Sequence, residues 1–232
     1  YELHPESRPP RCADHPFFAT DDWFIGTTAM DAGIPEAIRN LTVTFRFNNL
    51  NSIRELFARY PSRVACLVME AATAEEPADG FLAETKRLCQ EHGALFILDE
   101  IITGFRWHLG GAQAVYGVTP DLATFGKALA NGFSLAALMG RREVMRLGGL
   151  DHDAPRVFLL STTNGAENHC LAAAIETMRT YREHDVVRTL YRQGERLRDG
   201  IRCLARAMGL EDYFQVIGRP TAKPGPQPLC SP

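Results

Sequence analysis

Two residues, Asp99 and Lys127, have the side chains and surroundings best suited to chemistry in this sequence. Asp99 follows the apolar run ALFIL at positions 94–98, and Lys127 lies 28 positions further on, within FGKALANG. A lysine amine can hold the aldehyde of pyridoxal phosphate as a Schiff base, and a carboxylate can keep the pyridine nitrogen of that cofactor protonated. The pair therefore suggests pyridoxal phosphate chemistry as a first hypothesis.

The neighbours of Lys127 favour a reactive amine over an ordinary surface lysine. Phe125 and Leu129 are apolar, and the other residues close by are glycine and alanine. Small neighbours allow another group to approach closely, and apolar neighbours exclude water, which favours the neutral, nucleophilic form of an amine. We therefore expect Lys127 to be the catalytic residue.

The run LFILDE also fits a P-loop ATPase, which presents a magnesium-binding carboxylate at the end of an apolar strand. Such an enzyme needs GxxxxGK followed by serine or threonine, usually ahead of that strand. Here the Gly-Lys pair, Gly126 and Lys127, comes after the strand. Asp121 stands at the position of the first glycine, and Ala128 at that of the hydroxyl residue. The ATPase hypothesis fails on these three points.

Composition and charge favour a globular protein that acts on a small molecule. The chain has 232 residues, 45% of them hydrophobic, which is enough to bury a sizeable core. Its 25 basic and 28 acidic residues are interspersed and give a net charge of -3, so we expect no nucleic acid and no membrane as partner. No apolar run approaches the roughly 18 residues of a membrane span, and no signal-like segment opens the sequence.

The six cysteines are irregularly spaced and form no CxxC pair. This pattern is typical of reduced thiols in a cytosolic protein rather than of a disulfide framework. We therefore expect a cytoplasmic location.

Apolar runs alternate with helix-like segments, and these elements must position Asp99 and Lys127. A strand, helix and strand are expected at 64–69, 80–93 and 94–98, with further strands at 122–125, 134–139 and 157–160. This alternation predicts an α/β domain with a mostly parallel sheet. Ligands of such domains bind at the carboxyl ends of the strands.

Two amphipathic helices are expected in the last third of the chain. Residues 167–182 repeat apolar side chains at helical spacing, and a second such pattern follows Asp185, which can cap it. We expect both apolar faces to pack in a core or an interface. The run YFQVIG at 213–218 predicts one more strand.

The segment LDHDAP contains three candidate metal ligands, Asp151, His152 and Asp153. Adjacent residues in regular structure cannot all face one ion, so we expect a polar loop and no metal site.

Three segments, LFILDEIITGFR, GGAQAVYGVTPDLATFGKALANG and FLLSTTNGAENHCLAAA, resemble the class III pyridoxal phosphate aminotransferases. The likeness spans 22–218 and lies close to the glutamate semialdehyde aminomutase-like branch. It implies the three-layer type I fold of pyridoxal phosphate-dependent transferases, with a large domain and the start of a truncated small domain. The expected parts are an off-pattern segment at 1–12, a cofactor-binding large domain at 13–184 and a connecting helix with the start of the small domain at 185–232.

The resemblance also assigns the cofactor site. Lys127 matches the Schiff-base lysine, Asp99 the partner of the pyridine nitrogen, and Ile101 the aliphatic residue on one face of the ring. Thr162 matches a threonine that reaches the cofactor phosphate of the neighbouring subunit, which implies a homodimer with shared sites. Glu75 falls near a position beside the cofactor in some members.

Two further positions depart from the common family pattern. Glu70 stands where the family usually has a Glu-Pro pair, with Ala71 in place of the proline. Ile102 replaces a glutamine that many aminotransferases place near the ring hydroxyl, and an aliphatic residue there is closer to the aminomutase-like branch.

The implied function is transfer of an amino group between a small-molecule donor and a keto acid or aldehyde. An intramolecular aminomutase of the glutamate semialdehyde type is the first alternative. The second is a catalytically impaired fragment that retains the fold. Relative to the family, the sequence lacks the glycine- and serine-containing loop that binds the cofactor phosphate and most of the small domain, and a phosphate without such an anion cradle would bind weakly.

Overall fold

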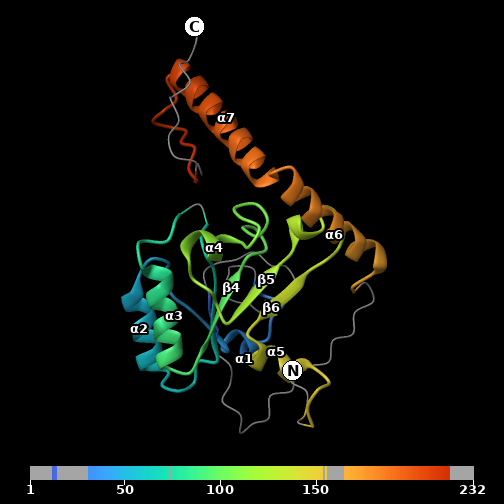
Figure 1. The fold of residues 1–232 in the computed structure, drawn as a ribbon. Coiled ribbons are helices and arrows are strands. Elements are labelled where there is room, and N and C mark those ends of the chain that lie inside the picture. The colour runs from blue at the N-terminus through green and yellow to red at the C-terminus, as the bar shows by residue number, and fades with distance from the viewer. Residues whose placement is uncertain (1–11, 15–30, 74, 154, 156–164, 220–232) are drawn as a thin grey trace.

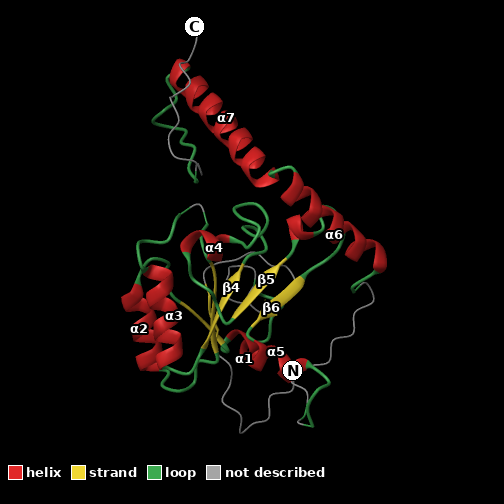
Figure 2. Cartoon of the chain, viewed as in Figure 1, coloured by secondary structure: helices red, strands yellow, loops and turns green. Residues whose placement is uncertain are grey.

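The computed structural model describes residues 12–14, 31–73, 75–153, 155 and 165–219. Within them, one six-stranded sheet forms the centre of the molecule, with strand order β2-β1-β3-β4-β5-β6 (Figures 1 and 2). The strands are β1 Cys12–Asp14, β2 Thr42–Thr44, β3 Cys66–Glu70, β4 Leu95–Asp99, β5 Leu122–Phe125 and β6 Ala137–Gly140. β1 to β5 pair in parallel, and β6 pairs antiparallel to β5. The structure is therefore the expected α/β fold with a mostly parallel sheet.

The helices connect the strands and continue beyond the last one. They are α1 Glu36–Arg39, α2 Leu50–Arg59, α3 Phe81–Glu91, α4 Ala112–Tyr116, α5 Arg142–Met145, α6 Asn168–Glu183 and α7 Val186–Ala207, with 3-10 turns η2 Lys127–Leu129 and η3 Arg146–Gly148. α2 and α3 lie side by side against one side of the sheet, α6 packs near the turn after β5, and α7 extends away from the sheet (Figure 1).

The central strands form because alternate side chains enter a common core. In β3 the buried positions are Leu67 and Met69, and in β4 they are Phe96 and Leu98. Apolar residues of α2 and α3 pack against them in the same cluster: Ile53, Phe57, Phe81, Leu82 and Leu88. This core holds β3 and β4 in register over five residue pairs, from Cys66 with Leu95 to Glu70 with Asp99.

Most of the predicted central elements are confirmed. β3, α3 and β4 lie where the strand, helix and strand were expected, and β5 coincides with the predicted strand at 122–125. β6 begins at Ala137, later than the expected start at 134. The strand expected at 157–160 lies outside the described residues.

Three predictions for the last third of the chain differ from the structure. Residues 213–218 form turns and irregular chain after α7 rather than a strand, and the Phe214 N–H donates to the Leu210 carbonyl. Asp185 precedes α7 in the left-handed conformation with a φ of 46°, and its side chain makes no capping hydrogen bond. The apolar faces of α6 and α7 are largely exposed, with Ile175 at 65% and Leu197 at 66%. The α7 face is therefore not a core stripe in this structure, whereas α6 buries Ala174 and Tyr181 in a core cluster. The expectation of an interface stays a prediction.

The expectation of reduced thiols is wrong at Cys203. Cys89 and Cys170 carry free thiols, whereas Cys203 is disulfide-bonded.

Among the described residues, no helix is both long and apolar enough to cross a membrane.

Candidate active site

The parallel strands β3, β4 and β5 bring three ionisable residues to one edge of the sheet. Glu70 ends β3 and is the direct register partner of Asp99, which ends β4. Asp99 in turn pairs with Thr124 of β5, and Lys127 follows that strand after Gly126. Since the carboxyl ends of parallel strands form the ligand-binding edge of such a sheet, these residues lie where a ligand would bind.

Two hydrogen bonds fix the carboxylate of Asp99. The Ile101 N–H donates to Oδ1 of Asp99 at 2.8 Å, and the Thr124 hydroxyl donates to the same oxygen at 3.2 Å. Both donors favour the charged carboxylate over the neutral acid, and they hold it at the end of β4. The geometry suits a group that must present a fixed negative charge to a ligand.

Lys127 has an unusual backbone conformation at the start of η2. Its φ is 45°, in the left-handed region, which costs a side-chain-bearing residue about 1–2 kcal/mol. Its carbonyl accepts a hydrogen bond from the Asn131 N–H at 3.1 Å, which closes the turn. Strain of this kind is concentrated at functional sites because the surrounding fold must maintain it.

The setting of Lys127 differs in one respect from the expectation. Phe125, Ala128, Leu129 and Ala130 are buried as expected, but the lysine itself is exposed. The apolar neighbours pack into a cluster that also contains Phe105 and Tyr181, so they do not cover the amine. The expected exclusion of water from the amine is therefore absent from this structure.

Ile101 is brought next to Lys127, as its expected role requires. A Cβ atom added to Gly126 would lie 3.6 Å from Cγ2 of Ile101 and 3.7 Å from its Cγ1, which are ordinary contact distances. The Ile101 side chain therefore lies against the backbone of the residue that precedes the lysine. It offers an apolar surface between the ends of β4 and β5.

The structure does not test the cofactor role of any expected site residue, Glu75 and Thr162 included. Glu75 lies in the loop after β3, where its carboxylate accepts a hydrogen bond from Nδ2 of Asn48 at 2.7 Å. Asn48 also accepts from the Ala78 N–H at 2.7 Å, so it holds this loop in place. Thr162 lies outside the described residues. The roles of Glu75 and Thr162 at the cofactor stay predictions.

Glu70 belongs to the same cluster, although the sequence reasoning did not place it there. The pKa of its carboxyl is raised from 4.5 to about 7, mainly by burial and next by the charge of Asp99, while the charge of Lys127 acts in the opposite direction. The three groups therefore interact electrostatically. Two signals were present in the sequence, since Glu70 ends an apolar strand as Asp99 does and stands where the resembling family has a Glu-Pro pair.

The neighbouring Glu100 has a structural role that the sequence did not reveal. It is fully buried, and its two oxygens accept hydrogen bonds from the N–H groups of Ala112 at 2.8 Å and Gln113 at 2.7 Å, at the start of α4. The Thr103 hydroxyl donates to it as well. Glu100 thus anchors the loop that follows Asp99.

A second cluster of potential ligands lies at the start of α6. Side-chain atoms of Glu167, His169 and Cys170 lie within 4.8 Å of one another. The Cys170 thiol donates to Glu167 at 3.8 Å, and Nε2 of His169 is 3.5 Å from the same carboxylate oxygen. These contacts link the three side chains around the first turn of the helix. The segment 151–153, which was expected to form a polar loop, is a bend that follows η3.

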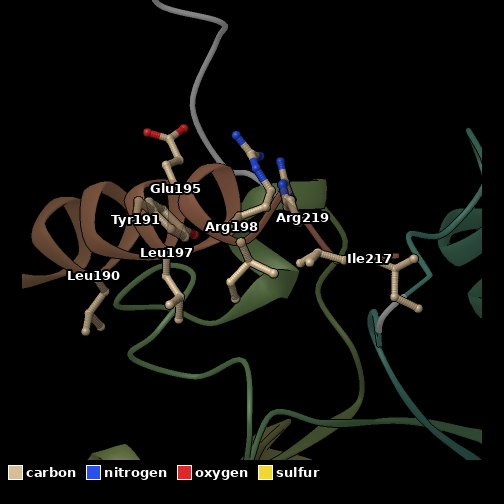
Figure 3. Close-up of a pocket in the computed structure, with 11 residues that line it drawn as sticks. Leu190, Tyr191, Glu195, Leu197, Arg198, Ile217 and Arg219 are labelled. Carbon is tan, nitrogen blue, oxygen red and sulfur yellow. The ribbon is translucent and has the colours of Figure 1, made fainter. Parts of the chain in front are cut away.

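A separate pocket of about 240 Å³ lies between α7 and residues 216–219 (Figure 3). Its lining includes Leu190 and Leu197 of α7 and Ile217 of the segment beyond it, together with Arg198 and Arg219. None of its lining residues comes from the sheet, so the pocket is distinct from the edge where Asp99 and Lys127 meet.

Comparison with known proteins agrees with this architecture. The chain is similar to the FumI protein of Sphingopyxis sp. MTA144, solved in its PLP internal aldimine form, with 26% identity, a TM-score of 0.76 and coverage of 87% of this chain and 48% of that one. It is also similar to an omega-transaminase from Sphaerobacter thermophilus, with 27% identity, a TM-score of 0.73 and coverage of 87% and 50%. The fold is shared with N-acetylornithine aminotransferase from Stenotrophomonas maltophilia K279a at 21% identity, a TM-score of 0.66 and coverage of 93% and 50%.

These matches identify the fold as that of the type I pyridoxal phosphate-dependent transferases. The chain spans about half the length of each of these proteins. Residues 25–215 match the family model of the class III aminotransferases. The chain therefore belongs to the class III aminotransferase family.

Proposed function

We propose that this chain carries the cofactor-binding part of a pyridoxal phosphate-dependent aminotransferase. The observation that supports this most directly is the placement of Lys127 and Asp99 at one edge of a parallel sheet, within a chain that belongs to the class III family. The similar FumI structure holds this cofactor. The reaction would transfer an amino group between a small-molecule donor and a keto acid or aldehyde.

The residues at the sheet edge fit the cofactor chemically. Lys127 offers an amine for the aldehyde, Asp99 a fixed carboxylate for the pyridine nitrogen, and Ile101 an apolar surface for the ring. Bound pyridoxal phosphate supplies an electron sink for the substrate carbon that carries the amino group. Thr162, from the neighbouring subunit, and Glu75 complete the proposed set.

The side chains divide the work between orientation and proton transfer. The carboxylate of Asp99, held by the Ile101 N–H and the Thr124 hydroxyl, keeps a negative charge in one position. Nζ of Lys127, on an exposed side chain, would take the proton from the substrate carbon that carries the amino group and deliver it to the cofactor carbon. The apolar face of Ile101 keeps water from one side of this region.

The assembly and setting of the protein are part of the proposal. A homodimer with shared sites follows from the expected role of Thr162, and the large domain would comprise 13–184, followed by the start of a small domain. A cytoplasmic location fits an enzyme that acts on small metabolites. The aminomutase alternative is favoured by one observation, the aliphatic Ile102, whose side chain is 40% exposed near the site.

Cofactor addition to the purified 232-residue chain tests the proposal. We expect a new visible absorption band, and we expect borohydride reduction to attach the cofactor covalently to the peptide that contains Lys127, as read by mass spectrometry. Lys127→Ala should abolish both signals because it removes the amine. Lys86→Ala on α3 is the matched control and should retain them. Equal labelling in the Lys127→Ala variant, or no labelling of the unaltered chain, would contradict the proposal.

A further inference from the structure

We propose that Glu70, the register partner of Asp99, is a positioning residue of this site, a proton-holding carboxyl that prevents two adjacent negative charges at the ends of β3 and β4. The inference rests on the proposed function only for its consequence, which is the binding of an anionic cofactor. The proton on Glu70 can be measured in the chain alone.

Strand geometry places the two carboxyl groups together. Glu70 and Asp99 are register partners in neighbouring parallel strands, which lie about 4.8 Å apart. Side chains at partner positions of such strands project from the same face of the sheet. The two carboxyl groups therefore share one face at one edge, where two negative charges would repel each other strongly.

The surroundings decide which of the two carboxyl groups keeps its charge. Asp99 accepts two hydrogen bonds, from the Ile101 N–H and the Thr124 hydroxyl, and both stabilise its ionised form. Glu70 is half-buried, and burial is the largest cause of its raised pKa, followed by the charge of Asp99. Such a division, in which one carboxylate is stabilised and its neighbour is protonated, is how a paired site holds a proton.

Lys127 links this proton to the chemistry of the site. Its positive charge lowers the pKa of Glu70 from what burial and Asp99 would otherwise produce, and the net value is about 7. If Lys127 loses its charge, the pKa of Glu70 must therefore rise and the carboxyl takes up a proton from solvent. Only the O–H bond of Glu70 is made or broken in this exchange.

The charged groups that act on Glu70 lie at the ends of the next two strands, β4 and β5. Among the described residues they are Asp99 at the end of β4 and Lys127 after β5. Glu100, the next carboxyl along the chain, is instead hydrogen-bonded to the start of α4 through Ala112 and Gln113. The proton on Glu70 should therefore respond to changes at Asp99 and Lys127.

The sign of the pH effect follows from the raised pKa. Between pH 4.5 and about 7 the folded chain keeps a proton on Glu70 that the unfolded chain has released, so this group favours folding at low pH. That contribution is lost as the pH rises through about 7. Above this range Glu70 is charged, and the sheet edge carries a second negative charge that disfavours an anionic ligand.

The first test measures the proton without any cofactor. Carboxyl resonances of the chain labelled with 13C-glutamate are titrated by NMR, and Glu70→Gln identifies the Glu70 signal by its loss. We expect a midpoint near 7 in the unaltered chain, a lower midpoint in Asp99→Asn and a higher one in Lys127→Met. Exposed Glu55 of α2 serves as control and should not respond to either change. A Glu70 midpoint near 4.5, or one that ignores Asp99→Asn, overturns the proposal.

The second test measures the consequence for binding. The dissociation constant of pyridoxal phosphate is determined by equilibrium dialysis at pH 6.5 and 8.5 for the unaltered chain and for Glu70→Gln. Because ionisation of the free cofactor affects both proteins equally, the informative quantity is the ratio between them. We expect affinity to fall with pH more steeply in the unaltered chain, by a factor on the order of five, the effect of one added charge near the surface.

The two tests separate failure of this inference from failure of the proposed function. Equal pH dependence in both proteins overturns the role of Glu70 in binding, even if the cofactor binds well. If the unaltered chain binds no cofactor at either pH while Glu70 still titrates near 7, the proposed function fails and the proton-holding role stands. Should Glu70→Gln not fold, Glu70→Asp removes the same resonance from the glutamate-labelled chain and so identifies it, and the titrations in Asp99→Asn and Lys127→Met then decide the outcome.

Discussion

The two adjacent carboxyl residues at the end of β4, Asp99 and Glu100, differ in burial and in hydrogen-bond partners. Asp99 is held at the sheet edge by Ile101 and Thr124, whereas Glu100 is fully buried against the start of α4. Successive side chains of a strand point to opposite faces, so neighbouring residues can serve different layers of the fold. Asp99 is therefore available to a ligand, whereas both oxygens of Glu100 are used in hydrogen bonds that hold the start of α4.

Asp99→Asn should remove the negative charge of this side chain while keeping its size. The amide oxygen can still accept hydrogen bonds from Ile101 and Thr124, so the fold should be retained. Loss of the negative charge should weaken pyridoxal phosphate binding and reduce any aminotransferase rate on the order of 100-fold, as when one electrostatic partner is removed from an active site. Spectroscopic titration and a coupled amino-transfer assay measure this, with exposed Asp212→Asn as control. Binding equal to that of the unaltered chain would remove Asp99 from the site.

At this scale the sequence reveals residue types better than their environments. Asp99 and Lys127 were predicted because an acid at the end of an apolar run and a lysine among small residues can both be recognised in the sequence. The raised pKa of Glu70 was missed because it depends on burial and on the β3–β4 register. The exposure of Lys127 was missed because apolar neighbours can pack beneath a side chain instead of over it.

Asp121 connects three strands at the level of secondary structure. Its buried carboxylate accepts from the Phe96 N–H of β4 at 2.8 Å and from Nη1 of Arg141, just after β6, at 2.9 Å. The Arg141 N–H donates to the Asp121 carbonyl at 2.9 Å. The residue before β5 thus fixes both neighbouring strands, and through β5 it fixes the start of the turn that carries Lys127.

Asp121→Ala should destabilise the sheet far more than Arg141→Ala does. Removal of the carboxylate leaves a buried N–H of Phe96 without its acceptor, which costs about 2–3 kcal/mol of unfolding free energy. The Arg141 side chain is 53% exposed, so its loss should cost less than about 1 kcal/mol. Urea denaturation of the two variants measures the difference. Equal losses would show that the ion pair, rather than the bond to β4, holds the strands.

Some helices and strands can be predicted from the apolar pattern of their own residues, whereas others form only because they pair with strands distant in the sequence. β3, α3, β4 and β5 were predicted because their apolar patterns lie within short stretches of the sequence. β1 was not predicted, since its three residues form a strand only by pairing with both β2 and β3. The strand predicted at 213–218 is wrong because a strand-like composition does not supply a partner strand.

On the scale of the whole molecule, α7 extends away from the sheet (Figure 1). Several apolar side chains along it are exposed. Leu197, Leu204 and Met208 are 66%, 64% and 69% exposed. Contiguous exposed apolar surface on a soluble protein favours association. The alternative of an interface, left open by the sequence pattern, therefore remains a prediction for this helix.

Replacement of two of these leucines tests that prediction. The double variant Leu197→Gln, Leu204→Gln should shift the chain toward monomer because it removes apolar area that association would bury. Sedimentation velocity over a concentration series measures the change, and exposed Arg196→Gln on the same helix is the control. An unaltered chain that stays monomeric at every concentration would show that this surface drives no association.

The order of the strands also has a consequence for how the molecule folds. β3, β4 and β5 are consecutive in the chain as well as adjacent in the sheet, whereas β1 must insert between β2 and β3. Glu70, Asp99 and Lys127 therefore meet through short chain closures, which lose little entropy and form quickly. We expect the strands that carry the site to acquire structure early in folding and their amides to exchange slowest with solvent. Slow exchange there would make the chemical centre the most persistent part of the chain.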